Sequence, residues 1–333
     1  MEVALILEWI IKSAFLLLFG TGGFAYLTLY ERRALARIQT RIGPNRAGPF
    51  GILQPVADGI KLIFKEELIP AKADKIIFVL APIVTVFPAL VIWAVIPWGT
   101  SVNLFGREIS LYLADVNVGV LYLTAVASIA VYGIVLAGWS SNNKYALMGG
   151  LRSSAQMVSY EIALGLSFIG PIMLAGSMSL VDIVEAQNPW WFAITQPLSF
   201  IIFLIAGLAE VNRAPFDMPE AEQELTAGYH AEYSGMKFAL FFMAEYIKMI
   251  AICAIAVTLY LGGYGLPLIA DTGGWGPLIF LGKVIILLFG VIWVRATLPR
   301  FRYDRLMAFG WKILLPLSLA NVFITAAILV FIG

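Results

Sequence analysis

Residues 210–235 read EVNRAPFDMPEAEQELTAGYHAEYSG, an acidic stretch between two long apolar segments. Six of the chain's 21 acidic residues lie in it, namely Glu210, Asp217, Glu220, Glu222, Glu224 and Glu232. Charge is costly inside hydrocarbon, so acids packed this closely beside segments of membrane length need a physical reason. The stretch indicates that water, basic partners or exchangeable protons lie close to it.

The composition is that of a membrane protein. Of the 333 residues, 61% are hydrophobic and 13% are charged, whereas soluble domains average about 25% charged residues. The mean hydropathy is +0.89. Because apolar segments long enough for helices of about 20 residues recur along the chain, we expect one all-α polytopic membrane domain, residues 1–333. The eight predicted transmembrane helices cover about residues 3–30, 76–98, 116–139, 156–175, 193–211, 237–261, 278–297 and 313–332.

The basic residues predict the orientation of the chain, since Lys and Arg accumulate in cytoplasmic loops. Here 18 of the 22 basic residues lie in the loops after spans one, three, five and seven. These loops, including the acidic loop at about 212–236, are therefore predicted to be cytoplasmic. An even number of spans places both termini on the outer side. The first span lacks a basic leader and a cleavage site, so we expect it to be retained and not removed as a signal peptide.

A shorter amphipathic helix is predicted between the first two spans, at about residues 51–65. Its apolar residues recur at helical spacing, while Gln54, Asp58, Lys61 and Lys65 fall on the other face. Fifteen residues rise only about 22 Å, which is too short to cross a bilayer. The pattern is typical of a helix lying in the plane of the membrane interface. On periodicity alone, a helix that covers other cytoplasmic loops is the alternative.

Cysteine and histidine are too rare for a redox centre in this chain. Cys253 is the only cysteine and His230 the only histidine. Iron–sulfur clusters bound by thiolates, the usual structural zinc sites and bis-histidine haem all need more of these ligands. Any redox centre must therefore belong to a partner.

Three carboxylates are predicted to lie in the same half of the bilayer. Glu161 is about five residues into the fourth span, Glu245 is about eight residues into the sixth, and Glu210 ends the fifth. At about 1.5 Å of rise per residue, the first two lie roughly 8–12 Å below the cytoplasmic surface. Burial favours the neutral form of a carboxyl group, which suits proton exchange. These residues are candidates for a proton path.

Two of these acids also have a purely structural interpretation. Glu245 could pair with Lys248, which lies three residues further along the same helix face. Glu161 could hydrogen-bond at the cytoplasmic surface or contact Arg152. The concentration of acids in one layer of the membrane favours the functional interpretation over these alternatives.

Helix capping explains only part of the acidic loop. Asp217 and Pro219 are typical of a helix start, with Glu220 in the first turn, where acids complement the helix dipole. Capping does not explain Glu222 and Glu224. The expected counter-charges in the same compartment are Arg213, Arg295, Arg300, Arg302 and Arg305.

Six segments carry a resemblance that runs nearly from end to end of the chain. They are QTRIGPNRAG at 39–48, GILQPVADGIK at 51–61, GWSSNNKYALMGGLRSSAQMVSYE at 138–161, RAPFDMPEAEQEL at 213–225, EYSGMKF at 232–238 and RATLPRFRYDRLM at 295–307. In these segments the chain resembles the H-subunit family of NADH-quinone oxidoreductase, the heel of the membrane arm of respiratory complex I. The motifs are long, ordered and jointly specific.

The resemblance implies an eight-span subunit of a proton-translocating enzyme in the bacterial plasma (inner) membrane. Such a subunit joins the peripheral redox arm to the membrane arm and forms part of a quinone chamber at the junction. Quinone is the implied substrate, and the iron–sulfur clusters and FMN are carried by partner subunits. The implied partners are the peripheral-arm subunits at the quinone site, the small and antiporter-like membrane-arm subunits, and lipid, with no nucleic acid.

The resemblance also assigns roles to individual residues. Glu161, Glu210 and Glu245 match the start of the proton path. The acidic loop beside the chamber is matched by Asp217, Glu220, Glu222, Glu224 and Glu232. The quinone chamber, its access route and its charged rim are matched by Gln39, Arg41, Asp58, Lys61, Lys65, Arg213 and Phe216.

The chain departs from the resemblance in the third span. Some members carry an acid there, whereas this chain has Ser128 and no acid between Val116 and Trp139. The sequence therefore gives no support for a role of this span in proton relay.

Other functions stay open at this level. Related heel subunits belong to membrane-bound hydrogenases and to dehydrogenases fed by other donors, and the donor is fixed by partners. The intramembrane acids would also suit a stand-alone proton or cation transporter, although the internal repeat common in transporters is not evident. A purely structural adaptor would explain the charged cytoplasmic loops by docking alone.

Overall fold

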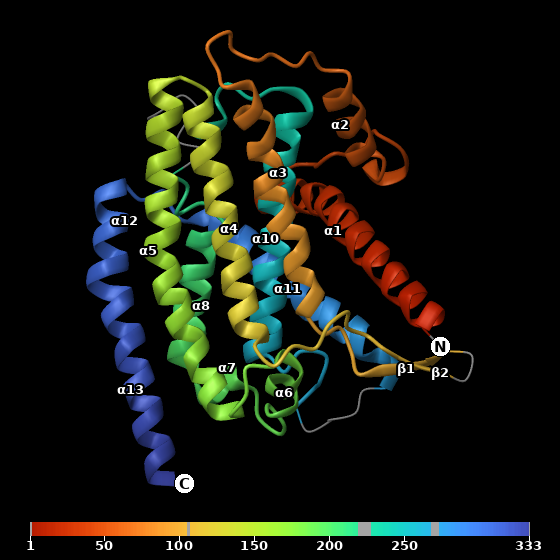
Figure 1. Ribbon diagram of the computed structural model, residues 1–333, viewed down its shortest axis with the longest axis vertical. Coiled ribbons are helices and arrows are strands. Elements are labelled where there is room, and N and C mark those ends of the chain that lie inside the picture. Colours follow the sequence, from red (N-terminus) through yellow and green to blue (C-terminus); the bar gives the residue numbers. More distant parts are fainter. Residues whose placement is uncertain (1, 105–106, 219–227, 268–272, 333) are drawn as a thin grey trace.

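Helix α10 (Gly235–Tyr260) is the most buried of the long helices, and five of the others pack against it. The computed structural model describes residues 2–104, 107–218, 228–267 and 273–332. The other long helices are α1 (Glu2–Ile38), α3 (Lys75–Val91), α4 (Gly119–Ser140), α5 (Lys144–Ala175), α8 (Pro197–Glu210), α11 (Gly276–Thr297) and α13 (Leu315–Ile332). Those that pack against α10 are α1, α3, α5, α8 and α11. In Figure 1, α1 leans away from the bundle, and it is the least buried of the long helices.

Short elements close the two ends of the bundle. Both termini lie in the half of the molecule opposite α2 (Gln54–Ile63), as Figure 1 shows. An antiparallel hairpin of β1 (Ser101–Leu104) and β2 (Arg107–Ser110) lies in the same half as the termini. The remaining short elements are η1 (Pro49–Gly51), η2 (Ile92–Val95), α6 (Leu180–Glu185), α7 (Phe192–Thr195), η3 (Gly228–His230), η4 (Gly273–Trp275), α12 (Tyr303–Phe309) and η5 (Gly310–Leu314).

The predicted helical, multi-span fold is confirmed in outline, and the β1–β2 hairpin is the one departure from it among the described residues. Within the described residues, seven helices are long and apolar enough to cross a membrane, counting η2 with α3 and treating α12, η5 and α13 as one continuous helix. The fifth predicted span corresponds to none of the seven, because α8 has only 14 residues. Helix length alone therefore supports seven crossings and leaves the fifth predicted span as a shorter apolar helix.

Three helices extend beyond the predicted spans. α1 continues to Ile38, α5 begins at Lys144, and the last helix begins with α12 at Tyr303. The start of α5 is set by Asn143, whose side chain accepts a hydrogen bond of 2.9 Å from the backbone N–H of Tyr145. Hydropathy marks only the apolar part of a helix, so the polar turns beyond it were missed.

The fifth predicted span is broken near its start. Proline disfavours helical geometry in the residue before it, and Gln196, directly before Pro197, separates α7 from α8 with a non-helical φ of −132°. The Gln196 side chain is buried there, and its Nε2 donates to Oγ1 of Thr325 on α13, at 3.2 Å. The fifth predicted span, 193–211, is therefore not one continuous helix in the structure.

Glycines let the helices that carry the site approach closely. A Cβ at Gly133 of α4 would clash with Oγ1 of Thr85 on α3. One at Gly149 of α5 would lie 2.7 Å from the Cα of Gly228. These contacts hold α3, α4 and α5 together and seat the segment before α10 against α5.

Candidate functional site

Arg213 lies just after α8, and only 2% of its surface is exposed. Its Nε is 2.5 Å from Oε1 of Glu245 on α10. The guanidinium also lies over the ring of Tyr246, 4.4 Å from the ring centroid. A carboxylate and an aromatic face both attract a cation, so together they offset part of the cost of removing its water shell.

The segment that carries Arg213 is fixed by a buried glutamine on α5. The Nε2 of Gln156 donates to the carbonyl oxygens of Ala209, at 2.8 Å, and Phe216, at 2.6 Å. The ring of Phe216 stacks on that of Phe301 at a centroid distance of 5.7 Å, and the backbone N–H of Phe301 donates to Pro215 O at 3.1 Å. The loop after α8 is therefore held between α5 and the segment that follows α11.

A second ion pair lies beside the first. The Nζ of Lys248 on α10 is 3.9 Å from Oε1 of Glu210, the last residue of α8, which is 4% exposed. The purely structural interpretation of the sequence paired Glu245 with Lys248. In the structure each of these two residues instead has an ion-pair partner from the C-terminal end of α8 or the loop after it.

Glu161 joins this group from α5. Its Oε1 accepts a hydrogen bond from the hydroxyl of Ser128 on α4. Arg152, the alternative partner, lies over the ring of Tyr303, 5.1 Å from its centroid. The third predicted span thus supplies a polar group to the carboxylate, which was not foreseen from its lack of an acid.

Two small cavities lie among these charges. One, of about 40 Å³, is lined by Glu161, Glu210 and Lys248 together with aliphatic side chains. The other, of about 20 Å³, is lined by Glu210, Lys248 and Glu245 and by polar residues such as Asn212. We call Glu161, Glu210, Arg213, Glu245 and Lys248 the charge cluster.

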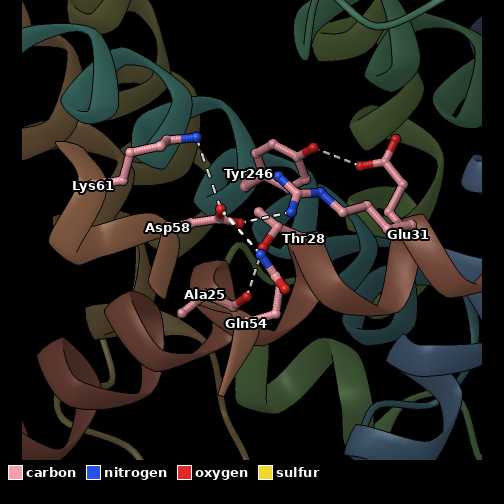
Figure 2. Close-up of polar contacts among 8 residues, drawn as sticks. Ala25, Thr28, Glu31, Gln54, Asp58, Lys61 and Tyr246 are labelled. Carbon is pink, nitrogen blue, oxygen red and sulfur yellow. Dashed lines mark hydrogen bonds and ion pairs between the residues drawn. The ribbon is translucent and has the colours of Figure 1, made fainter. Parts of the chain in front are cut away.

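A further buried acid was not predicted as a site residue. Glu31 of α1 is 3% exposed, accepts a 2.6 Å hydrogen bond from the hydroxyl of Tyr246 and pairs with Arg295 of α11. Figure 2 shows the Tyr246 hydroxyl pointing at the Glu31 carboxylate. The sequence interpretation ended the first span at Tyr30. Following the helix to Ile38 would have placed Glu31 on a membrane helix.

The predicted rim residues on α2 form an exposed network with α1. Asp58 lies 2.6 Å from Arg32 NH1, 3.3 Å from Gln54 Nε2 and 3.9 Å from Lys61 Nζ. Figure 2 shows Asp58 between the side chains of Gln54 and Lys61. Lys65 is exposed just after α2. The network ties α2 to the end of α1.

The remaining predicted rim residues, Gln39 and Arg41, are exposed and contact each other. Oε1 of Gln39 accepts a 2.7 Å hydrogen bond from Nε of Arg41 at the exposed end of α1. The structure therefore divides the predicted quinone residues. Arg213 and Phe216 are buried beside the bundle core, and the others lie at the surface.

The described part of the acidic loop is firmly packed. Glu232 accepts a 2.7 Å hydrogen bond from Nδ2 of Asn143, at the start of α5. Burial raises the pKa of the neighbouring Tyr233 to about 12, so this phenol stays protonated and donates to the carbonyl of Phe78 at 3.2 Å. Asp217 is half-buried directly after Phe216. Glu220, Glu222 and Glu224 lie outside the described residues.

The side chains of the charge cluster are of types suited to proton transfer and charge compensation. Carboxylates and a lysine can exchange protons, whereas an arginine holds its proton at all ordinary pH values. The cluster places both kinds of group within an apolar bundle, where a change of charge on one is felt strongly by the others. In the part of the chain that the structure describes, no group of three or more His, Cys, Asp and Glu residues could hold a metal ion.

The comparisons with known proteins agree with one another. A family model described as NADH dehydrogenase matches residues 11–326. The H subunit of NADH-quinone oxidoreductase from Protochlamydia amoebophila is 55% identical over 303 residues, covering 91% of each chain. The H subunit from Thermomicrobium roseum is 52% identical over 92% of each chain, and an H subunit from Geobacter metallireducens is 51% identical over 98% of this chain and 95% of its own.

Proposed function

We infer the function of this chain from its family, because it belongs to the H subunits of NADH-quinone oxidoreductase. It is a mostly helical, multi-pass membrane subunit of that enzyme complex, and quinone is the substrate of the family. What this chain contributes to the reaction is our proposal. It forms part of the quinone chamber and couples quinone reduction to proton translocation through buried carboxylates.

The observation that carries the coupling role is the charge cluster inside an apolar bundle. Five ionisable side chains from α5, α8, α10 and the loop after α8 lie together, and most of their surface is buried. Two electrons added to a quinone near such a cluster demand protons or rearranged charge, because charges interact strongly in a low dielectric. A carboxylate in the cluster responds by taking up or releasing a proton.

We place the quinone beside the loop after α8, which carries Phe216 as well as Arg213 of the charge cluster. Phe216 and Arg213 supply an aromatic face and a cation on the inner side of this position. On the outer side the proposed rim consists of Gln39, Arg41, Asp58, Lys61 and Lys65. The acidic wall of the chamber consists of Asp217, Glu220, Glu222, Glu224 and Glu232.

The proposed arrangement in the membrane is a single domain, residues 1–333, with eight crossings. α7 and α8 together make the short fifth crossing, and the termini face the outer side of a bacterial plasma membrane. The position of both termini opposite α2 supports an even number of crossings (Figure 1). α2 lies in the cytoplasmic interface, which agrees with the exposure of Val56, Ile60 and Ile63 on its apolar face.

The partners follow from the same proposal. The iron–sulfur clusters and FMN belong to other subunits, and the terminal cluster lies in the peripheral-arm subunits that complete the quinone site. Small membrane-arm subunits and antiporter-like subunits receive the change in protonation from the charge cluster.

The decisive variant is Glu245→Gln in the assembled enzyme. It removes the charge that faces Arg213 and the proton-accepting group, so we expect quinone-linked proton pumping to fall by about tenfold or more, the scale of a lost proton-transfer group. NADH oxidation with an artificial acceptor, which bypasses the quinone, should stay nearly intact. Both activities are measured in membrane vesicles.

A matched control is Glu185→Gln, which removes an exposed carboxylate on α6 at the other end of the bundle. It should leave pumping unchanged. Normal coupled activity and pumping in Glu245→Gln would remove this residue from the proposed mechanism.

A further inference from the structure

Lys248 is the one member of the charge cluster to which the proposed function gives no task. It lies on the same face of α10 as Glu245, three residues further on. Its Nζ is 3.9 Å from Glu210 Oε1, which is an ion pair but is too long for a direct hydrogen bond. A proton can pass between these two groups only after a small movement or through a bridging water.

The two cavities give Lys248 a position between the other carboxylates. Glu210 and Lys248 line both cavities, while Glu161 lines only the larger and Glu245 only the smaller. Volumes of about 40 and 20 Å³ each exceed the roughly 10–15 Å³ that one water needs. Among the described residues, only Glu210 and Lys248 line both cavities, so this pair is the boundary between them that a proton passes on the direct route.

One oxygen of this boundary is left unsatisfied. Oε2 of Glu210 is buried and has no hydrogen-bond partner among the described residues. A buried acceptor without a partner costs free energy, so it is expected to bind a water or a proton. Oε1 faces Lys248, which leaves Oε2 as the atom from which a proton can leave the pair.

The simpler explanation is that Lys248 only compensates the charge of Glu210. An arginine would do that as well and would hold its proton at every ordinary pH, as Arg213 does beside Glu245. The cluster thus contains one cation that keeps its proton and one that can release it. The releasable proton lies at the boundary between the cavities.

We propose that Lys248 relays protons between the two cavities, a proposal that rests on the proton-coupling function above. The ammonium group gives one proton to the Glu210 carboxylate, so that an N–H bond breaks, an O–H bond forms and both groups become neutral. The neutral carboxyl group then rotates, so that the oxygen that carries the proton takes the position of Oε2. The amine takes a proton that arrives through one cavity, and Glu210 releases its proton into the other. One proton has crossed the boundary, and the pair has regained its charges without any oxidant or reductant.

The first test compares Lys248→Arg with the unaltered enzyme in membrane vesicles. Arginine keeps the positive charge but does not release its proton. We expect quinone-linked NADH oxidation and proton pumping to fall by about tenfold or more, with artificial-acceptor NADH oxidation unchanged. Pumping at the level of the unaltered enzyme would show that only the charge matters and would overturn the relay.

A second variant keeps the proposal testable if Lys248→Arg does not assemble. Lys248→Ala leaves a space that a small amine can fill. Methylamine should restore quinone-linked NADH oxidation severalfold, because it can release a proton, and methylguanidine should not. Failure of methylamine to restore the rate, or equal restoration by both compounds, would overturn the relay.

One control variant and one comparison separate this inference from the proposed function. Lys12→Met removes a lysine that pairs with Glu8 near the N-terminal end of α1, and it should leave quinone-linked NADH oxidation and proton pumping unchanged. If Glu245→Gln loses pumping while Lys248→Arg keeps it, the coupling function stands and the relay fails. If both variants pump normally, Glu245 has no part in the proposed mechanism and the relay fails as well.

Discussion

Two ion pairs of almost equal length lie in very different surroundings. Arg213 and Glu245 approach to 2.5 Å, and Arg32 and Asp58 approach to 2.6 Å. The side chain of Arg213 is 2% exposed, however, whereas that of Arg32 is 49% exposed. The first pair lies inside the helix bundle, and the second ties α1 to α2 at the surface.

The comparison shows that the length of an ion pair does not by itself determine how much the pair contributes to the free energy of folding. An exposed pair exchanges good solvation for a modest attraction and contributes little. A buried pair is costly to form, but removal of one partner leaves the other charge in a medium that cannot solvate it. The buried pair is therefore a point where a change of charge has large consequences, which a coupling site requires.

The largest effect is expected for Arg213→Gln. This change leaves the Glu245 carboxylate without its buried cation, and such a loss costs about 3–5 kcal/mol of folding free energy. We expect the thermal unfolding midpoint of the purified complex to fall and less of the subunit to accumulate in the membrane. Heating curves followed by light scattering and intrinsic fluorescence measure this.

The double variant Arg213→Gln/Glu245→Gln is the internal control for that experiment. It removes both charges, so we expect it to be more stable than Arg213→Gln alone. An unchanged midpoint in the single variant would mean that burial does not distinguish the two ion pairs.

A smaller effect is expected for Gln156→Leu. The buried amide of Gln156 donates to Ala209 O and Phe216 O, and leucine would remove both donations. Ala209 O would keep the backbone N–H of Asn212, at 3.2 Å, whereas Phe216 O would lose its donor. Each unsatisfied buried acceptor costs about 1–3 kcal/mol. We expect the loop that carries Arg213 to loosen, which increased hydrogen exchange of the peptide at 209–218 would report.

Gln54→Leu is the matched control for this variant. Gln54 donates to Asp58 in the α1–α2 network, and its hydrogen bond of 3.3 Å is long. The same substitution there should change hydrogen exchange little. Equal changes in the two variants would contradict the distinction between buried and exposed contacts.

The helical fold could be predicted because an apolar segment long enough to cross a membrane can form few structures other than a helix. The predicted layer of acids also has a local basis, since Glu161, Glu210 and Glu245 fall near the ends of such runs. The structure brings Glu210 into one cavity with Glu161 and into another with Glu245. Their roles in proton transfer stay predictions.

The partners of these acids could not be predicted from local pattern. Glu31 meets Tyr246 and Arg295, which are more than 200 residues away in the chain, and the loop after α8 is held by Gln156 of α5. Periodicity describes one helix at a time and carries no information on which helices meet. The break at Gln196 is an exception with a local signal, because Gln196 and Pro197 interrupt the apolar segment near its start.

The smallest effect is expected for Arg32→Ala, the exposed counterpart of Arg213→Gln. Water can reach both Arg32 and Asp58, and after the substitution Gln54 and Lys61 remain beside the Asp58 carboxylate. Exposed pairs contribute about 0–1 kcal/mol, so the unfolding midpoint should change little. Any small change should shrink further when salt is raised from low to physiological ionic strength, because salt screens exposed charges far more than buried ones. Arg213→Gln, measured in the same two buffers, should show a loss that does not depend on salt. A loss for Arg32→Ala as large as that for Arg213→Gln would show that the α1–α2 contact is buried in the assembled enzyme, and the two ion pairs would then belong to one class.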